Sequence, residues 1–372
     1  MFNPFRSRLL EVTVVALLAG CGGGAQSPAP VDDNSLGSIV DAAVAAEMKA
    51  QGMPGMTVAI ARNGVILYAQ GYGYADLSTH QTMSADTVMQ IGSVTKQFTA
   101  TAILQLQDAG LLDIDRTVVS YLPHYGFDPR ITLRMLLNQT SGLQDYLNMP
   151  SLQQYAAGGA PESTVLNAVV AAPLLFDPGS AFNYSNSNYY ILGSVIEAVS
   201  FETYAGYLAE RVFAPAALNN TSYLRPASSA SPYTRGSNGP VAGNIPDPSA
   251  FFAAGQLWSN VQDLASWDAA LLNGKLIPRT SFNSMITPAA APDFQQSDPS
   301  TYGMGWIVGS NVSGHPFIWH NGGTGSYTAF NGLLTDDGFS VTVLTNYTLN
   351  EEVPLLQFGQ NLLQAICNAQ GC

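Results

Sequence analysis

The spacing of hydrophobic residues changes along the chain from a helical period to a strand period and back. Apolar residues recur every three or four positions through residues 32–50, which predicts an amphipathic helix. Two β-rich runs follow, 56–61 and 65–70, and Asn63-Gly64 lies between them. Because Asn-Gly tolerates the positive φ angles of a tight turn, this arrangement predicts an antiparallel hairpin.

Helical spacing dominates the middle of the chain, and strand-like runs return near its end. The helical patterns cover residues 94–108, 132–137, 187–199, 204–212 and 261–272. Loops rich in Gly, Pro and Ser interrupt them, and the longest of these loops covers 225–250. Strand patterns occupy residues 302–308, 317–320, 327–333 and 340–345. A last helical pattern at 354–367 closes the chain.

The order of these elements predicts an α/β fold. One antiparallel sheet would take strands from both ends of the chain and would be flanked by the terminal helices. We expect the α/β part to comprise residues 33–85 and 300–372, with an inserted, mostly helical part at 86–299. A functional groove is expected between the two parts, where ligand sites commonly form.

The first residues of the chain look like a bacterial export signal. Two arginines precede an apolar run, 12–20, that is too short to span a bilayer. The run leads into Leu-Ala-Gly-Cys, which resembles the lipobox in which the cysteine, here Cys21, is acylated. We therefore expect a signal peptide at 1–20, a flexible tether at 21–32 and a lipoprotein of the cell envelope facing the periplasm. An ordinary secretory signal cleaved nearby is the alternative.

Composition and charge exclude several classes of partner. The chain has 26 acidic and 13 basic residues, a net charge of −13, and no basic cluster, so nucleic acid is not expected to bind. A membrane partner is expected only through the lipid anchor. The four histidines form no His-Glu-x-x-His pattern, and neither a metal nor a cofactor is predicted. Export would permit a disulfide between Cys367 and Cys372, and two free thiols are the alternative.

One helical pattern carries a serine and, three residues later, a lysine: Ser93 and Lys96. Positions three apart lie on one face of a helix, and the serine is close to the positive end of the helix dipole. Apolar residues of the same helix would bury the lysine, and burial favours its neutral form, which can accept a proton. The chain has only three lysines, and only Lys96 follows a serine at this spacing. A surface pair that has this spacing by chance is the alternative.

Two further motifs combine polar groups with tight turns. Tyr184-Ser185-Asn186 precedes an apolar helix, and its phenol could act as a general base beside an ammonium group. Its asparagine can both donate and accept hydrogen bonds. His320-Asn321-Gly322 ends a strand pattern, where glycines let a substrate approach the backbone. The alternatives are a capped turn with a packed tyrosine and a structural histidine.

The three motifs occur in a fixed order along the chain: Ser93-Val94-Thr95-Lys96, Tyr184-Ser185-Asn186 and His320-Asn321-Gly322. Together they resemble the motifs of the serine β-lactamases and penicillin-binding proteins. Within these, the resemblance is to the branch of class C β-lactamases, D-Ala-D-Ala carboxypeptidases and family VIII esterases. It covers about residues 56–345 and implies an α/β sheet with a helical domain.

The resemblance also implies a role for each motif residue. Ser93 would be the acylated nucleophile, and Lys96 and Tyr184 would share the proton transfers. Asn186 would orient the lysine and the substrate. The backbone N–H groups of Ser93 and Gly323 would form the oxyanion hole. The third motif would supply further substrate-binding residues: His320, Gly322 and Gly323.

The third motif departs from the family pattern. Lys-Thr-Gly is usual there, whereas this chain has His320 and Asn321, so a substrate carboxylate would be bound less firmly. We therefore expect a serine acyl hydrolase, either a carboxylesterase or a D-amino-acid peptidase or amidase, with weak or no β-lactamase activity. Its partner would be a small-molecule ester, amide or D-amino-acid peptide. Relatives usually have His where Gln139 stands, and the sequence gives no reason for that change.

Two other classes compete with this interpretation. The Ser-His-Asp hydrolases of the α/β-hydrolase fold place their nucleophile in a Gly-x-Ser-x-Gly elbow, and no serine of this chain lies in one. The more serious alternative is a non-catalytic sensor or scaffold that resembles a penicillin-binding protein and binds peptidoglycan stems. A pure binder would have no need of Ser93, Lys96 and Tyr184 together.

Overall fold

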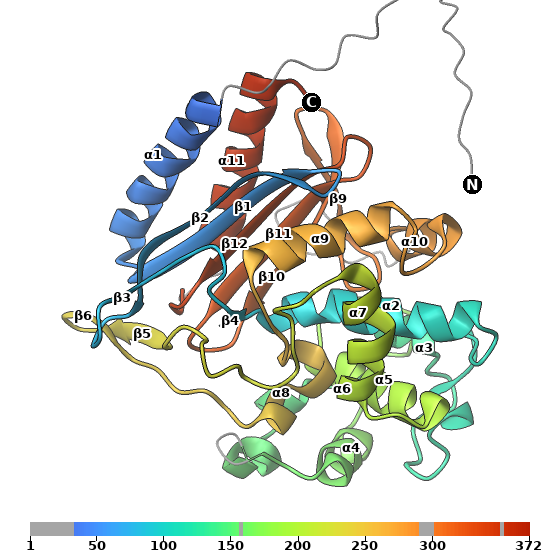
Figure 1. The fold of residues 1–372 in the computed structure, drawn as a ribbon. Helices are drawn as coiled ribbons and strands as arrows, with labels where there is room; N and C mark the ends of the chain where they lie inside the picture. Colours follow the sequence, from blue (N-terminus) through green and yellow to red (C-terminus); the bar gives the residue numbers. More distant parts are fainter. Residues whose placement is uncertain (1–32, 156–158, 290–300, 350–352) are drawn as a thin grey trace, which may run out of the picture. The chain divides into compact units, whose positions relative to one another are not determined.

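Strands from both ends of the chain pair in one eight-stranded antiparallel sheet in the computed structural model (Figure 1). Along the sheet the strands are β3 (Gln81–Thr82), β2 (Val65–Asp76), β1 (Gly55–Arg62), β12 (Phe339–Thr345), β11 (Thr328–Leu334), β10 (His315–Gly323), β9 (Ile307–Val312) and β8 (Thr301–Tyr302). Strand β1 lies beside β12, with Met56 opposite Thr345. The predicted α/β fold, with a sheet built from both chain ends, is therefore confirmed.

The structure describes residues 33–155, 159–289, 301–349 and 353–372. Residues 33–372 form one compact unit. The predicted signal peptide, the acylation site at Cys21 and the tether lie outside the described residues. Within the described ranges, no helix combines the length and the apolar character that crossing a membrane requires.

The central strands of the sheet are buried on both faces, because alternate residues of a strand face opposite layers, whereas most of β2 is half-buried or exposed. Met56, Val58 and Ile60 of β1 pack with the terminal helices, α1 (Asp33–Gln51) and α11 (Val353–Gln370). Ala59 of the same strand belongs instead to the larger core that includes the helical part. Figure 1 shows α1 and α11 together on one side of the sheet and the helical part on the other.

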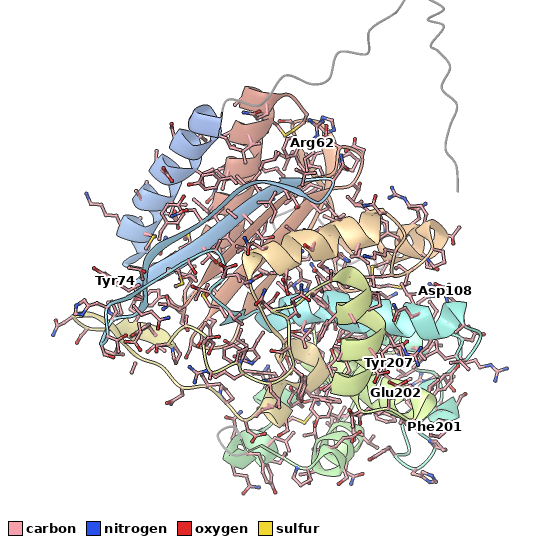
Figure 2. The ribbon with its side chains drawn as sticks, in the orientation of Figure 1. Arg62, Tyr74, Asp108, Phe201, Glu202 and Tyr207 are labelled. Atoms are coloured by element: carbon pink, nitrogen blue, oxygen red, sulfur yellow. A yellow bond between two sulfur atoms is a disulfide. The ribbon has the colours of Figure 1, made fainter. Side chains whose placement is uncertain are left out.

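Helix α2 (Thr95–Asp108) lies in the middle of the helical part. Every residue from 95 to 104 is buried, polar ones included. Helices α5 (Asn186–Ser200) and α8 (Pro248–Gly255) pack against it. Helix α5 is followed by its C-cap residue Phe201, which is left-handed (φ 60°) and 93% exposed (Figure 2). Around these helices lie α3 (Leu133–Leu137), α4 (Glu162–Ala171), α6 (Tyr204–Leu208), a π-helix (Ala209–Phe213), α7 (Ala214–Ala216), α9 (Val261–Leu272) and α10 (Arg279–Met285).

The β1–β2 hairpin and the C-terminal disulfide are both formed by residues close together in the sequence. Asn63 and Gly64 join β1 to β2 with φ angles of 51° and 80°, as predicted for an Asn-Gly turn. Cys367 and Cys372 form a disulfide, which decides between the two alternatives left open by the sequence. This bond fastens the end of the chain to helix α11.

Several regions differ from the sequence predictions. Residues 302–308 were expected to form one strand, but β8 ends at Tyr302 and β9 begins at Ile307. The break contains Gly305 (φ 78°), where a Cβ would lie 2.7 Å from the carbonyl oxygen of Lys96, so this turn packs directly on α2. The predicted loop at 225–250 contains a hairpin, β5 (Tyr233–Gly236) with β6 (Gly239–Ala242), and the start of α8. Helices α4 and α10 were not predicted.

A buried polar network connects α2 and α9 to the sheet. The side-chain amide of Asn331, on β11, donates to Asp268 Oδ1 (2.8 Å) and to Gln97 Oε1 (3.2 Å). The Oδ1 of Asn331 accepts from the Thr342 hydroxyl (3.0 Å), and Trp267 also donates to Gln97. Burial raises the pKa of Asp268 to about 8, although hydrogen bonds from Asn331 and Ser340 oppose this shift. The Asp268 carboxyl is therefore held in its neutral form at neutral pH.

We predict that Asp268→Asn flattens the pH dependence of stability. Between about pH 4 and pH 8 the folded protein keeps a proton on Asp268 that the unfolded chain releases. The free energy of unfolding therefore falls as pH rises, by at most about 1.4 kcal/mol per pH unit, and levels off above pH 8. Urea denaturation at pH 5, 6.5 and 8 should show this slope in the wild type and in the exposed-site control Asp86→Asn. Equal slopes in Asp268→Asn and the wild type would contradict the prediction.

Candidate active site

Ser93 stands on a sharp turn that presses against the end of strand β10. It belongs to a 3₁₀ turn (Gly92–Val94) that leads directly into α2. Gly92 has a φ of 51°, and a Cβ there would lie 2.8 Å from the backbone nitrogen of Gly323. A Cβ on Gly322 would lie 2.9 Å from the backbone nitrogen of Ser93. Glycine is required at both positions, because any side chain would separate the serine from the strand.

The Lys96 amine is the centre of the site. Its side chain is fully buried, and Nζ lies 3.0 Å from Ser93 Oγ. Nζ also donates to Asn186 Oδ1 and to the carbonyl oxygen of Ala254, both at 2.8 Å. The predicted serine–lysine contact is therefore present, and two carbonyl oxygens fix the amine in place.

Asn186 is oriented by a carboxylate behind it. Its Nδ2 donates to Asp145 Oδ2 (2.8 Å), so its Oδ1 must face Lys96. The other oxygen of Asp145 accepts from the backbone N–H of Leu147 (3.0 Å). Asp145 thus connects the second motif to the segment that carries Leu147.

Tyr184 lies over the lysine. Lys96 Nζ is 4.8 Å from the centroid of the Tyr184 ring, a distance typical of cation–π contacts. The centroid of the same ring is 6.1 Å from that of Tyr302 and 6.1 Å from that of His320. The structure therefore brings Ser93, Lys96 and Tyr184 to one place, as the sequence predicts.

His320 is buried beside this group, with both ring nitrogens bonded to protein. Its Nδ1 lies 2.6 Å from the carbonyl oxygen of Asn321, which can only accept, so Nδ1 carries the hydrogen. Its Nε2 then accepts from the Tyr302 hydroxyl at 3.0 Å. Burial, and next the charge of Lys96, lower the pKa of His320 to about 3. A neutral ring supplies no positive charge for a substrate carboxylate.

Gln139 is a supporting residue whose purpose the sequence did not reveal. Its backbone is left-handed (φ 65°), and its side chain is fully buried. Its Oε1 accepts from the backbone N–H of Ser185 (3.0 Å) and from the side-chain amide of Asn188. Gln139 therefore holds the backbone between Tyr184 and Asn186. A buried left-handed residue inside a turn is not visible in hydrophobic spacing.

Helix α8 supplies a hydrogen-bond acceptor for Lys96 that none of the three motifs predicted, the carbonyl oxygen of Ala254. The helix is kinked at Phe252, whose backbone (φ 39°, ψ −130°) is unusual for a residue with a side chain. The Phe252 ring packs against Tyr190, Tyr204 and Tyr223 at centroid distances of 5.0, 5.2 and 6.4 Å. This aromatic packing holds the strained backbone that turns the Ala254 carbonyl towards Lys96.

These groups open into a cavity of about 540 Å³, which we call the Ser93 cavity. Its lining is Ser93, Leu147, Phe182, Tyr184, Asn186, Phe251, Ala254, Gly255, Tyr302, Ile307, Trp319, His320, Asn321, Gly323 and Leu356. None of these described lining residues is acidic, lysine or arginine. No group of three or more His, Cys, Asp or Glu side chains in the described part of the chain could hold a metal.

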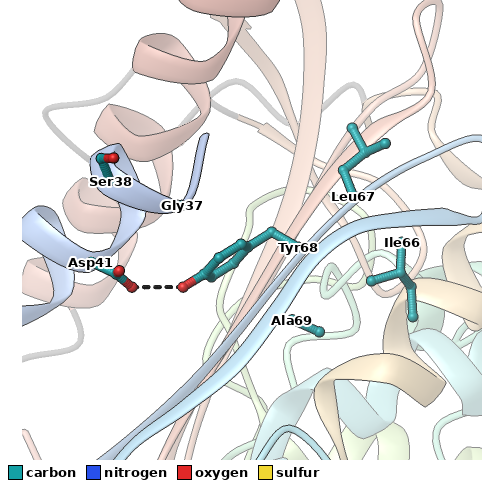
Figure 3. A pocket seen from close by; sticks show the side chains of 7 residues that line it. All are labelled: Gly37, Ser38, Asp41, Ile66, Leu67, Tyr68 and Ala69. Atoms are coloured by element: carbon teal, nitrogen blue, oxygen red, sulfur yellow. Dashed lines mark hydrogen bonds between the residues drawn. The ribbon is translucent and has the colours of Figure 1, made fainter. Parts of the chain in front are cut away.

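A second hollow, of about 560 Å³, lies between α1 and β2 (Figure 3). Ser38 lines it, but its lining contains no lysine or histidine that could take a proton from the hydroxyl. Hydrogen bonds from Tyr68 and Tyr72 lower the pKa of Asp41, so this carboxylate is a weak base. The Ser93 cavity is therefore the candidate active site.

Comparisons with known proteins show the family of the chain. The model of the beta-lactamase family matches residues 40–364, and the chain belongs to this family. The putative penicillin-binding protein PbpX of Bacillus subtilis (strain 168) is 32% identical over 256 residues. That match covers 68% of this chain but only 61% of PbpX, so the chain spans about three fifths of its relative's length.

Two solved structures are similar over their whole length. A D-stereospecific amidohydrolase from Streptomyces sp. has a TM-score of 0.74 and 27% identity, covering 88% of this chain and 98% of that one. EstCE1, described as a hydrolase with promiscuous acyltransferase activity, has a TM-score of 0.78 and 23% identity, covering 89% and 99%. The fold is thus that of a family whose solved members include hydrolases.

We predict that His320 stays neutral between pH 5 and pH 8. A ring whose pKa lies near 3 takes up no proton in this range, and its hydrogen should stay on Nδ1. Long-range ¹H–¹⁵N NMR spectra, assigned with a His320→Gln variant, measure both properties. The chain's other three histidines are internal controls. A midpoint near 6.5 for the His320 signals would contradict the prediction.

Proposed function

We propose that the protein is a serine hydrolase that forms an acyl-enzyme on Ser93. The observation that carries this proposal is the position of the Lys96 amine, between the Ser93 hydroxyl and two fixed carbonyl oxygens. These two carbonyls can only accept hydrogen bonds, so they take two N–H groups of the amine. In a neutral amine the lone pair is then left for the serine hydroxyl, which makes Lys96 a suitable proton acceptor.

In the proposed reaction, Ser93 Oγ attacks the substrate carbonyl carbon while its proton passes to Lys96 Nζ. The carbonyl electron pair moves onto oxygen, and the backbone N–H groups of Ser93 and Gly323 stabilise this oxyanion. When the intermediate collapses, the bond to the leaving group breaks, and Tyr184 passes a proton from Lys96 to that group. Water then attacks the acyl-enzyme along the same path in reverse.

The lining of the Ser93 cavity supports a neutral substrate. Its described residues offer aromatic and aliphatic surface, amides and hydroxyls, and His320 is uncharged. A carboxylate, which β-lactams and D-Ala-D-Ala peptides carry, finds no lysine or arginine among these described lining residues. We therefore propose a carboxylesterase, or an amidase of D-amino-acid derivatives without a free carboxylate, with weak or no β-lactamase activity. The similarity to a D-stereospecific amidohydrolase and to EstCE1 supports both reaction types.

We also propose that the protein is exported and is held in the cell envelope by acylated Cys21. The disulfide between Cys367 and Cys372 supports export, because such bonds persist in oxidising compartments. A sensor that binds peptidoglycan stems without turnover is the second candidate. The resemblance to the putative penicillin-binding protein PbpX favours it.

We predict that Ser93→Ala abolishes the hydrolysis of p-nitrophenyl acetate. Lys96→Ala and Tyr184→Phe should each lower kcat/KM by about 10² to 10⁴, the usual contribution of a positioned acid or base. The matched control is Lys275→Ala, at an exposed lysine, which should keep the wild-type rate. Steady-state rates of purified full-length protein measure these effects, and wild-type turnover in Ser93→Ala would refute the site.

A second prediction distinguishes the serine hydrolase from the non-catalytic sensor. A fluorophosphonate probe should label the wild type, and Ser93→Ala should not be labelled. In a panel of esters, D-amino-acid amides, nitrocefin and D-Ala-D-Ala peptides, the esters and amides, which carry no carboxylate, should turn over at least tenfold faster in kcat/KM. No labelling and no turnover of any substrate would support the sensor. Preference for the carboxylate-bearing substrates would overturn the proposed specificity.

A further inference from the structure

We propose that a small hollow beside the Ser93 cavity is a subsite for an aliphatic acyl chain, and that Leu147 divides the two. This inference rests on the proposed function. The hollow has a volume of about 70 Å³, and we call it the side hollow. Leu147 lines both spaces. In α8, Ala250 lines the side hollow, and the next residue, Phe251, lines the Ser93 cavity.

The chemistry of the side hollow suits hydrocarbon. Its lining includes Leu152, Val165, Ala160 and the rings of Tyr146 and Tyr155, and it contains no charged residue among those described. Its volume equals that of about two water molecules in the liquid. The hollow therefore has room for the last few carbons of a chain whose carbonyl lies at Ser93. An apolar pocket of this kind discriminates chain length by about tenfold or more per carbon.

Hydrogen bonds hold the backbone on both sides of the boundary between the two spaces. The Leu147 side chain can therefore be shortened without disturbing this backbone. The Leu147 backbone N–H is held by Asp145, which also holds Asn186. The Tyr146 backbone N–H donates to Ser187 Oγ (2.9 Å). The Tyr146 hydroxyl donates to the carbonyl oxygen of Ala250 (2.5 Å) and so connects this segment to α8. Shortening the Leu147 side chain should join the two spaces without moving the groups around Lys96.

The position of Tyr184 assigns the side hollow to the acyl group. In the proposed reaction the leaving group departs beside Tyr184, whose ring neighbours Tyr302 and His320. None of these three residues lines the side hollow, which meets the Ser93 cavity at Leu147. Leu147 therefore limits the wild type to short acyl chains, and medium-length chains reach the side hollow only when this side chain is shortened or displaced.

The test compares kcat/KM for p-nitrophenyl octanoate and acetate within each variant. We expect Leu147→Ala to raise the octanoate-to-acetate ratio at least tenfold. The matched control is Leu356→Ala, because Leu356 lines the Ser93 cavity but not the side hollow, and its ratio should change less than twofold. Val165 lines the side hollow but not the Ser93 cavity, so adding Val165→Phe to Leu147→Ala fills the side hollow and should return the ratio to the wild-type value. Equal gains in the two alanine variants, or no effect of Val165→Phe, would overturn the subsite.

A binding measurement decides the same point without turnover. In Ser93→Ala protein, calorimetry with methyl octanoate should show at least tenfold tighter binding when Leu147→Ala is added, and no gain when Leu356→Ala is added. If no variant hydrolyses any ester but this difference appears, the proposed function fails and the subsite stands. If esters are hydrolysed but neither the ratio nor the binding responds to Leu147→Ala, the function stands and the subsite is wrong.

Discussion

The buried amine of Lys96 is the interaction on which the rest of the site depends. An amine out of contact with water is costly unless its hydrogen-bonding groups are matched. Here the matching oxygens come from three segments far apart in the chain: Ser93 before α2, Asn186 at the start of α5 and Ala254 in α8. The fold is therefore required to bring these segments together, and a shift of any one of them would leave the amine incompletely bonded.

Local patterns were sufficient to predict most strands of the sheet and the Ser93–Lys96 pair. Period-two runs and the Asn63-Gly64 turn fix the β1–β2 hairpin, because both are set by residues close in sequence. Ser93 and Lys96 could be paired for the same reason, since they are three residues apart at the start of one helix. The placement of Tyr184 near them needed the family resemblance, because spacing along the chain says nothing about which turn packs on which helix.

The groups that could not be predicted act through backbone atoms or unusual backbone angles. Every residue has a carbonyl, so no residue type marks Ala254 as a partner of Lys96. Gln139 and Phe252 hold positive φ angles that their side chains do not favour, and only tertiary packing explains them. The prediction of a single strand at 302–308 was wrong for a related reason. Gly305 turns the chain because α2 lies directly against it, which is a contact between distant segments.

The strain at Phe252 shows how packing and chemistry are coupled in this protein. A backbone outlier of this kind costs about 1–3 kcal/mol and persists only where its surroundings fix it. The rings around Phe252 do so, and so does Thr99 of α2, whose hydroxyl donates to the Ala253 carbonyl (2.7 Å) and contacts the Tyr204 hydroxyl (2.7 Å). Because Thr99 and Lys96 lie on the same helix, the element that carries the amine also fixes the segment that presents its acceptor. The distance between the Lys96 amine and the Ala254 carbonyl is thus set by contacts between α2 and α8.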